Sequence, residues 1–220
     1  MQENLKFDDI ADRYDFLNHL LSLGLDYYWR AAMVRALAPA PGELILDLAT
    51  GTGDSAKAIA KKGISVTGVD ISHKMLAAAR RKLRGLRYST VQGSAYSLPV
   101  RAGTFDGGVC AFGIRNMHET DDALREIYRA IKKGGRMVFL EFAMPRGMIR
   151  RPYRLYLKRI IPPAAGIFSS SEAYEYLGDS IEHFYPPDEF ARIIVRAGFS
   201  RCEKISLSMG CVYIHKAYKD

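Results

Sequence analysis

The sequence is poor in cysteine and histidine and has no long apolar run. Its three cysteines, Cys110, Cys202 and Cys211, form neither a CxxC pair nor an even set, so we expect reduced, mostly structural thiols. The five histidines lack metal-ligand spacing, and no metal is predicted. No apolar stretch approaches the roughly 18 residues of a membrane span, and residues 1–6 lack a signal-peptide core. These absences predict a cytoplasmic protein.

Acidic residues are outnumbered, with 24 acids against 32 bases and a net charge of +8. Such an excess suits an anionic partner, either nucleic acid or a membrane surface. A chain of 220 residues, 48% of them hydrophobic, has enough apolar content for one core of ordinary size. We therefore predict a single domain over residues 1–220.

Residues 44–56 form a strand, glycine loop and helix pattern. The apolar run 44–46 is typical of a strand buried on both faces, and Asp47 places a charge at its end. Gly51 and Gly53 allow backbone N–H groups to approach a ligand closely, and Ala56 begins a helical repeat. The pattern predicts a nucleotide-type pocket at the carboxyl end of a parallel sheet.

The same loop also fits the dinucleotide fingerprint of a dehydrogenase, and an isolated glycine turn often binds nothing. Asp47 suits the ammonium group that S-adenosylmethionine (SAM) has and NAD lacks. Asp70, 17 residues beyond Gly53, can bind the two ribose hydroxyls of either cofactor. The loop alone leaves the choice open.

Strand and helix patterns alternate through residue 142. Helical spacing covers residues 5–38 with a break at 22–24, and this segment either covers a substrate pocket or packs against the sheet. A strand is predicted at 86–92, and Ser94 after it could reach an adenine edge or simply form a turn. A strand at 107–112 leads into Arg115 and Asn116, a helix follows at 121–131, and a further strand at 136–142. The alternation requires a parallel sheet with right-handed crossovers.

The C-terminal part breaks this alternation. A helix is predicted at 187–197, then strands at 199–207 and 211–218 with only a short turn between them. Closely joined strands must be antiparallel. We therefore predict an α/β, doubly wound, Rossmann-like fold with a seven-stranded, mostly parallel sheet and a C-terminal antiparallel β-hairpin. That arrangement favours the SAM-methyltransferase version of the fold over the dehydrogenase version.

Several motifs carry a family resemblance from about Phe7 to Lys219. They are Tyr14-Asp15-x-x-Asn18-x-x-x-Ser22-x-Gly24-x-x-x-x-Trp29-Arg30, Asp47-Leu48-Ala49-x-Gly51-Thr52-Gly53-Asp54, Phe112-Gly113-Ile114-Arg115-Asn116, Gly134-Gly135-Arg136 and Leu140-Glu141-Phe142. On these motifs the chain resembles the ubiquinone/menaquinone biosynthesis C-methyltransferase family. The second motif is shared by many methyltransferases, whereas the first and third are specific to this family.

The resemblance implies SAM as cofactor, with Thr52 in the glycine loop, Asp70 on the ribose, Ser94 and Ala95 near the adenine, and Ala111 in the same pocket. The chain departs from the family pattern at four places. The family usually has His-Arg at Asp26-Tyr27, Asn at Ser94, Ser at Ala111 and Gly at Met209. Ser94 can still form a hydrogen bond, whereas Asp26-Tyr27 falls in the part expected to meet the substrate.

The family reaction moves the SAM methyl group to a ring carbon of a polyprenylated hydroquinone. Removal of a hydroxyl proton makes the ring carbon more nucleophilic, so the site needs a base and a group that stabilises the developing anion. We predict Arg115 and Asn116 as the catalytic residues. The base stays open between His118, Glu141 and a water path, and Glu141 could equally anchor a neighbouring loop. Tyr14 and Asp15 are candidates for the pocket wall.

Residues 145–180 are predicted to form a helical insertion that faces the substrate or a membrane, and residues 1–40 an N-terminal helical cap. An apolar stripe of Tyr153, Tyr156, Leu157 and Ile160 lies beside a cationic one. Such a helix either lies in a membrane interface or covers the substrate cleft. The basic residues, with no acid among them, are Arg146, Arg150, Arg151, Arg154, Lys158 and Arg159.

The expected partners are a lipophilic quinol and, transiently, an anionic membrane surface, which would make the protein peripheral at the inner face of the membrane. A homodimer is left open. Two other functions are considered: SAM-dependent methylation of another aromatic or lipid acceptor, and nucleic-acid binding through the net positive charge. No recognised nucleic-acid module supports the second, so no nucleic acid is expected.

Overall fold

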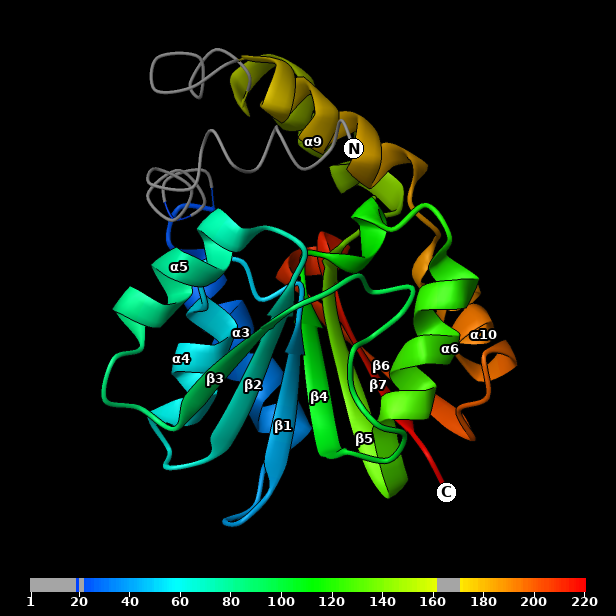
Figure 1. Ribbon diagram of the computed structural model, residues 1–220. Coiled ribbons are helices and arrows are strands. Elements are labelled where there is room, and N and C mark those ends of the chain that lie inside the picture. Colours follow the sequence, from blue (N-terminus) through cyan, green and yellow to red (C-terminus); the bar gives the residue numbers. More distant parts are fainter. Residues whose placement is uncertain (1–18, 20–21, 162–170) are drawn as a thin grey trace.

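A seven-stranded sheet with helices on both faces organises the chain (Figure 1). The computed structural model describes residues 19, 22–161 and 171–220, with the backbone alone for 171–176. The strand order is β3-β2-β1-β4-β5-β7-β6. The strands are β1 (Leu44–Leu48), β2 (Ser65–Asp70), β3 (Tyr88–Gln92), β4 (Phe105–Ala111), β5 (Ile131–Phe142), β6 (Arg201–Leu207) and β7 (Val212–Tyr218).

Strands β1 to β5 pair in parallel, whereas β7 runs antiparallel to both β5 and β6. This confirms the predicted fold class, including the terminal hairpin. The carboxyl ends of the parallel strands consequently meet at one edge of the sheet, at the top in Figure 1. The loops that follow them are therefore brought together there.

Each face of the sheet has its own core. On one face, α3 and α4 pack against side chains such as Ile45 and Val138. On the other face, α6 and α10 pack against Leu46 and Phe139, the next residues along the same two strands. Successive residues thus enter opposite cores, as the two-residue period of a strand requires. The helices are α3 (Leu25–Leu37), α4 (Asp54–Ala60), α5 (His73–Lys82), α6 (Thr120–Ala130), α7 (Arg150–Leu155), α9 (Ser171–His183) and α10 (Pro187–Arg196), with shorter turns η1 (Ile114–Asn116), η2 (Gly147–Ile149), η3 (Tyr156–Ile160) and η4 (Ser208–Gly210).

The predicted start of the fifth strand at residue 136 is wrong. The preceding helix ends at Ala130, and β5 begins at Ile131, which pairs with Phe105, whereas Arg136 pairs with Gly107. Residues 132–135 bulge out of the ladder between these pairs, with Gly134 at φ 78°. Gly134 and Gly135, a pair that usually marks the end of a helix, therefore lie within a strand in this protein.

The N-terminal break is found where it was predicted. A turn over residues 22–24, with Gly24 at φ 76°, precedes α3, which begins at Leu25. Of the predicted helix before this turn, His19 alone lies within the described residues. Helix α3 packs against β4, β5 and β7 and so fixes its start near the carboxyl edge of the sheet.

Candidate active site

Loops after β1, β2, β3 and β4 surround a first cavity of about 190 Å³ at the carboxyl edge of the sheet. Most of the predicted site residues line it, although they come from four separate segments of the chain. They are Gly51, Asp70, Ser94, Ala95, Ala111 and Asn116.

Asp70 fastens the loops after β1 and β2 to each other. Its Oδ2 accepts a hydrogen bond from the Gly51 N–H at 2.8 Å, and its Oδ1 accepts one from the Ser72 N–H at 2.9 Å. Gly51 has φ 54°, a left-handed conformation that costs glycine little. A carboxylate held in this way presents a fixed acceptor to the cavity. Ser94 sits in a tight turn, where its Oγ accepts from the Tyr96 N–H at 3.2 Å.

Asp47 does not line the first cavity, although it was predicted to bind the cofactor. It is 1% exposed, and its Oδ2 accepts from the Thr50 hydroxyl at 2.7 Å and from the Ala56 N–H at 3.0 Å. Burial raises its pKa to about 6. Asp47 therefore supports the glycine loop from beneath, within β1 rather than after it.

Thr52 and Gly53 also lie behind the cavity wall. The Lys82 Nζ donates to the Thr52 Oγ1 at 3.1 Å and to the Asp54 Oδ1 at 2.6 Å, which ties the loop to α5. Gly53 has φ 89°, and a Cβ there would lie 2.6 Å from the Leu83 Cδ1. Only glycine satisfies both the backbone conformation and this close approach. The contact of Thr52 with SAM stays a prediction.

Two non-glycine residues adopt left-handed conformations where β1 and β4 end. Ala49 has φ 52° and Phe112 has φ 58°, and both line the first cavity. A Cβ on Gly113 would come within 2.7 Å of the Ala49 Cβ, so the two loops are in close contact. Strained backbone of this kind concentrates at functional sites. No sequence pattern predicts it, since alanine and phenylalanine rarely have positive φ.

The predicted catalytic pair lies on η1 and divides between two cavities. Asn116 lines the first cavity, and its Oδ1 is buried without a hydrogen-bond partner among the described residues. Arg115 lines a second cavity. Its Nη1 donates to the Glu141 Oε1 at 2.8 Å and to the Phe112 carbonyl at 2.6 Å, and its Nε to the Ser180 hydroxyl at 3.3 Å.

Glu141 anchors the η1 loop. It is 1% exposed, and it accepts from the Arg115 N–H at 3.3 Å and the Phe142 N–H at 2.9 Å in addition to the Arg115 guanidinium. It lines neither cavity, and neither does His118, which is exposed. Of the two roles considered for Glu141, its contacts therefore favour the anchor. Tyr14 and Asp15 lie outside the described residues.

The second cavity, of about 260 Å³, is lined mainly by apolar and aromatic side chains. Phe112 belongs to both cavities, and its ring stacks on Phe142 with centroids 4.5 Å apart. The Trp29 ring lies edge-on to both, while its Nε1 donates to the Ser208 hydroxyl at 2.8 Å. A flat, apolar ring is the kind of ligand that such walls accept.

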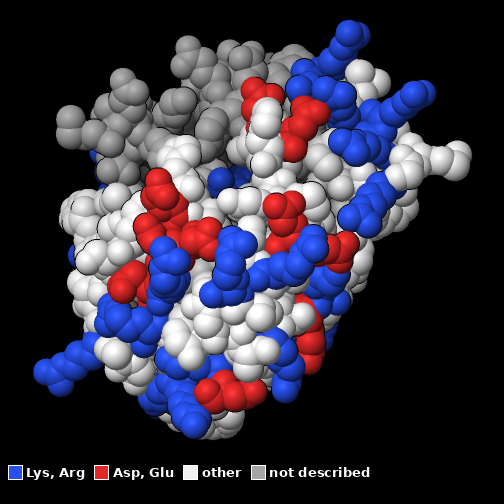
Figure 2. Space-filling model, turned by 90° about the vertical axis from the view of Figure 1, so that its right-hand side faces the viewer, with Lys and Arg blue, Asp and Glu red and all other residues white. Residues whose placement is uncertain are grey.

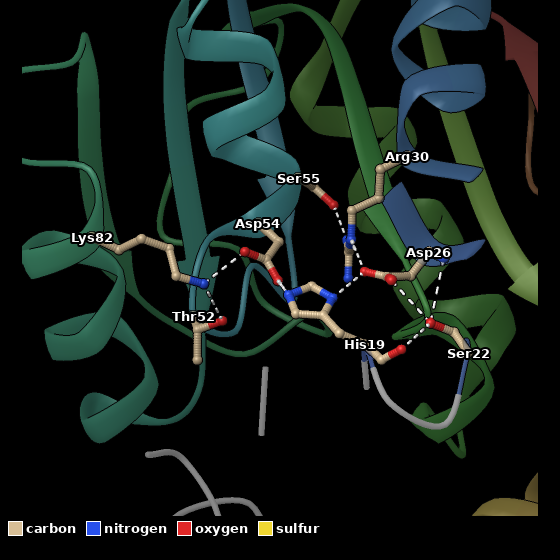
Figure 3. Close-up of polar contacts among 8 residues, drawn as sticks. All are labelled: His19, Ser22, Asp26, Arg30, Thr52, Asp54, Ser55 and Lys82. Carbon is tan, nitrogen blue, oxygen red and sulfur yellow. Dashed lines mark hydrogen bonds and ion pairs between the residues drawn. The ribbon is translucent and has the colours of Figure 1, made fainter. Parts of the chain in front are cut away.

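A polar network joins the mouth of this cavity to the glycine loop (Figure 3). Asp26 lines the second cavity and bonds to His19 and Ser22, while Arg30 donates to the Ser55 hydroxyl at the start of α4. The sequence placed Asp26 and Tyr27 near the substrate. Asp26 is 3% exposed and lines the cavity, whereas Tyr27 is 62% exposed and stacks on the His19 ring.

The stripe predicted for the basic segment points mostly inward. Tyr153, Tyr156 and Leu157 line the second cavity, and of the predicted stripe only Ile160, 52% exposed, faces outward. Of the two roles considered for this segment, covering a cleft therefore agrees with where these side chains lie. Within residues 22–161 and 171–220, no helix is both long enough and apolar enough to cross a bilayer.

The chain is similar throughout to one protein family. A model of the ubiE/COQ5 methyltransferase family matches residues 3–219. The chain is 44% identical, over 95% of its length and 90% of the relative, to a ubiquinone/menaquinone biosynthesis C-methyltransferase of Syntrophotalea carbinolica. It is 40% identical, over 99% of its length and 90% of the relative, to a demethylmenaquinone methyltransferase of Clavibacter sepedonicus. Among solved structures, a SAM-dependent methyltransferase of Thermotoga maritima has the same fold, with a TM-score of 0.69 and 19% identity over the whole of both chains.

Proposed function

The chain belongs to the ubiE/COQ5 methyltransferase family, and we propose that it transfers the methyl group of SAM to a ring carbon of a polyprenylated hydroquinone. Family membership makes it a SAM-dependent methyltransferase, and the names of its relatives connect it with quinone biosynthesis. The acceptor would be demethylmenaquinol or the equivalent benzoquinol precursor of ubiquinone. The observation that carries the proposal is the pair of adjoining cavities, one with polar loops and one with aromatic walls, which share Phe112.

The first cavity has the groups that SAM needs. Asp70 would bind the ribose hydroxyls, the turn at Ser94 and Ala95 would lie along the adenine, and Ala111 would line the same space. The buried Oδ1 of Asn116, which has no hydrogen-bond partner among the described residues, supports this assignment. A polar atom buried without a partner costs free energy that a bound ligand can offset. SAM bound there would supply an electrophilic methyl group.

Three further predicted cofactor residues would act through the shape of the loop. Asp47 holds the loop from beneath, Thr52 ties it to α5, and Gly53 permits the close contact with Leu83. We propose that these residues preorganise the backbone around Gly51. Substitution of any of the three should therefore weaken SAM binding, as substitution of Gly51 should.

The second cavity would hold the quinol ring. Phe112, Phe142 and Trp29 offer aromatic faces, and Arg115 brings a cation to the same space. The Arg115 side chain is 8% exposed and is held by Glu141, so its position is fixed before substrate arrives. A preorganised cation in a water-poor site stabilises negative charge that develops on a ring oxygen.

A basic edge next to this cavity would meet the membrane in which a polyprenyl chain dissolves. The exposed apolar side chains there are Met148, 95% exposed, Leu155 and Ile160, and among the described residues Arg150, Arg151 and Arg159 form no ion pair. Figure 2 shows Lys and Arg side chains projecting from the upper edge of the molecule. Exposed cations interleaved with apolar side chains suit an anionic bilayer surface.

A labelled-SAM assay tests the reaction. The acceptors are demethylmenaquinol, a ubiquinone-type benzoquinol without its ring methyl group, and a phenol that is not a quinol. We expect label in one or both quinols and none with the Asp70→Ala variant. Label in the phenol alone would overturn the proposed acceptor and favour another aromatic substrate.

Flotation with liposomes of anionic lipid tests the membrane contact. Replacing Arg150, Arg151 and Arg159 with glutamate should abolish flotation at low salt. The matched control replaces Lys61, Lys62 and Lys133 with glutamate, which makes the same change in net charge at exposed positions elsewhere. Equal loss in both triple variants, or no flotation of the wild type, would refute the contact.

A further inference from the structure

The second cavity contains several titratable side chains but few that can accept a proton. Guanidinium groups have no acceptor atom, so its two arginines cannot act as bases. Burial raises the pKa of the two tyrosines and of the cysteine, so they stay protonated and cannot accept a proton at neutral pH. Asp26 is the carboxylate left among the described lining residues. The others are Arg30, Arg115, Tyr153, Tyr156 and Cys211.

Asp26 is held by donors on one side and open to the cavity on the other. The His19 Nδ1 lies 2.7 Å from its Oδ2, and the Ser22 hydroxyl donates to its Oδ1 at 2.9 Å. The Arg30 Nε lies 3.9 Å from Oδ2. These contacts, drawn in Figure 3, fix the carboxylate in place. Its side chain is 4% exposed and lines the second cavity.

His19 is itself held in place from two further directions. Its ring stacks on Tyr27, with centroids 4.4 Å apart and planes inclined by 18°, and its Nε2 lies 4.0 Å from the Asp54 Oδ2. The imidazole thus bridges two carboxylates, one at the second cavity and one at the start of α4. An imidazole oriented in this way keeps Nδ1 directed at Asp26.

We propose that Asp26 is the base that accepts the hydroxyl proton of the acceptor ring, and that His19 is the positioning residue that orients it. The inference rests on the proposed function, since it takes the second cavity as the site of the quinol. It assigns roles to two residues that lie outside both the glycine loop and η1.

In the proposed step, methyl transfer to the ring is coupled to the loss of the hydroxyl proton. A ring π-electron pair forms the new carbon–methyl bond, and the pair of the broken methyl–sulfur bond stays on sulfur. The hydroxyl O–H bond breaks, its proton passes to Asp26, and its electron pair stays on the oxygen, which becomes a ketone-type carbonyl. Asp26 then returns the proton to that oxygen as the ring C–H proton leaves to water, so one proton is released per turnover.

A carboxylate suits this step because the hydroxyl becomes acidic only as the methyl group arrives. Attack by a neutral ring would place positive charge on the hydroxyl oxygen, which then loses its proton readily even to a weak base. General base catalysis of this type contributes about 10²- to 10⁴-fold to a rate. Arg115 would stabilise the same oxygen or its partner across the ring, but it cannot take the proton.

The Asp26→Asn variant tests the base directly, because it keeps the shape and removes the proton acceptor. We expect kcat to fall about 10²- to 10⁴-fold, with the SAM dissociation constant and the melting temperature close to those of the wild type. Asp26→Glu should recover part of the lost rate. Asp121→Asn, the same change at an exposed carboxylate on α6, is the matched control and should leave kcat unchanged.

A second measurement separates a base from a structural carboxylate. Acceptor hydroquinones with electron-withdrawing substituents carry more acidic hydroxyls, some of them already ionised at the assay pH. The ratio of wild-type to Asp26→Asn kcat should shrink by about tenfold or more across such a series, since an ionised acceptor needs no base. A ratio that stays constant, with parallel loss of SAM affinity and melting temperature, would overturn the proposal.

Two substitutions at His19 test the positioning role. Asparagine places an amide donor near the position of Nδ1, so His19→Asn should keep most of the rate, whereas His19→Ala should lose it and show the same dependence on acceptor acidity as Asp26→Asn. Equal losses in both would contradict a positioning role for His19. If the wild type methylates no quinol, the proposed function fails as well; if it does and Asp26→Asn matches it, only the present inference fails.

Discussion

Removal of the Glu141 carboxylate should destabilise the protein strongly. Glu141 and Arg115 form a buried ion pair, with side-chain exposures of 2% and 8% and an Nη1–Oε1 distance of 2.8 Å. Glu141 also accepts the Arg115 and Phe142 N–H groups, so Glu141→Leu leaves a buried cation and two N–H donors without their acceptor. Loss of one partner of a buried pair costs about 3–5 kcal/mol.

Urea unfolding measures this cost. With a slope of about 2 kcal/mol per M for a small protein, a loss of 3–5 kcal/mol lowers the unfolding midpoint by about 1.5–2.5 M. The double variant Arg115→Met/Glu141→Leu removes both charges, so it should be more stable than Glu141→Leu alone, because no uncompensated charge remains buried. Turnover should be lost in both.

The matched control is Asp121→Leu, which breaks the exposed pair with Arg196. The side chain of Asp121 is 40% exposed and that of Arg196 is 66% exposed. Exposed ion pairs of this kind contribute about 0–1 kcal/mol to the free energy of unfolding. A shift in the Glu141→Leu midpoint no larger than this control, or a double variant less stable than the single one, would refute the reasoning about burial.

Three further predictions concern the two cavities and the loops around them. Asp70→Ala should abolish SAM binding measured by calorimetry, because its carboxylate fastens two loops of the first cavity, whereas Arg115→Ala should keep binding and lose turnover. Met209→Gly should raise the free energy of unfolding by about 0.5–1 kcal/mol, because Met209 is 77% exposed and has φ 56°, where a side chain is strained. The raised pKa of Asp47, about 6 against 3.8, makes its charged form unfavourable in the folded state. The stability of the wild type relative to Asp47→Asn should therefore be greatest below about pH 4 and fall by about 3 kcal/mol as the pH rises to 6 and above.

Each of these predictions has a control. Equal losses of SAM affinity in Asp70→Ala and Arg115→Ala would contradict the division between cavities. Met148→Gly makes the same change at a methionine that is 95% exposed and not left-handed, and it should be neutral or destabilising. A stability difference between wild type and Asp47→Asn that does not vary between pH 4 and 7 would show that Asp47 is not buried as described.

The fold could be predicted from the sequence because its information is local. The alternation of apolar runs, the glycine loop and the closely spaced terminal strands each determine one element or one connection. The start of β5 could not be predicted, since its bulge depends on how Ile131 and Arg136 pair with β4. The residues that pair across neighbouring strands are far apart in the sequence, so their pairing produces no periodic pattern within the strand itself.

The first cavity could be predicted in the same way, but the direction of individual side chains could not. Asp47 follows an apolar run, which suggested a group facing a ligand, yet the Thr50 hydroxyl and the Ala56 N–H turn it inward. The stripe of Tyr153 and Tyr156 had the spacing of an amphipathic helix. Which of its faces is covered depends on segments far along the chain, such as Leu177 and Ile181.

The two cavities differ in how far their residues can change. The first is bounded by backbone at close approach: a Cβ at Gly93 would lie 2.5 Å from Pro99, and one at Gly113 2.7 Å from Ala49. The second is bounded by side chains from α3, η1, β5, α7, η3, α9 and η4, none of which belongs to the glycine loop. In the proposed arrangement, substitutions at positions such as Leu177 would therefore alter acceptor choice while SAM binding persists. The two cavities nevertheless meet at Phe112, which has a left-handed backbone and lines both of them. In the proposed arrangement its ring would therefore form a common boundary of the methyl donor and the acceptor, whichever acceptor ring is bound.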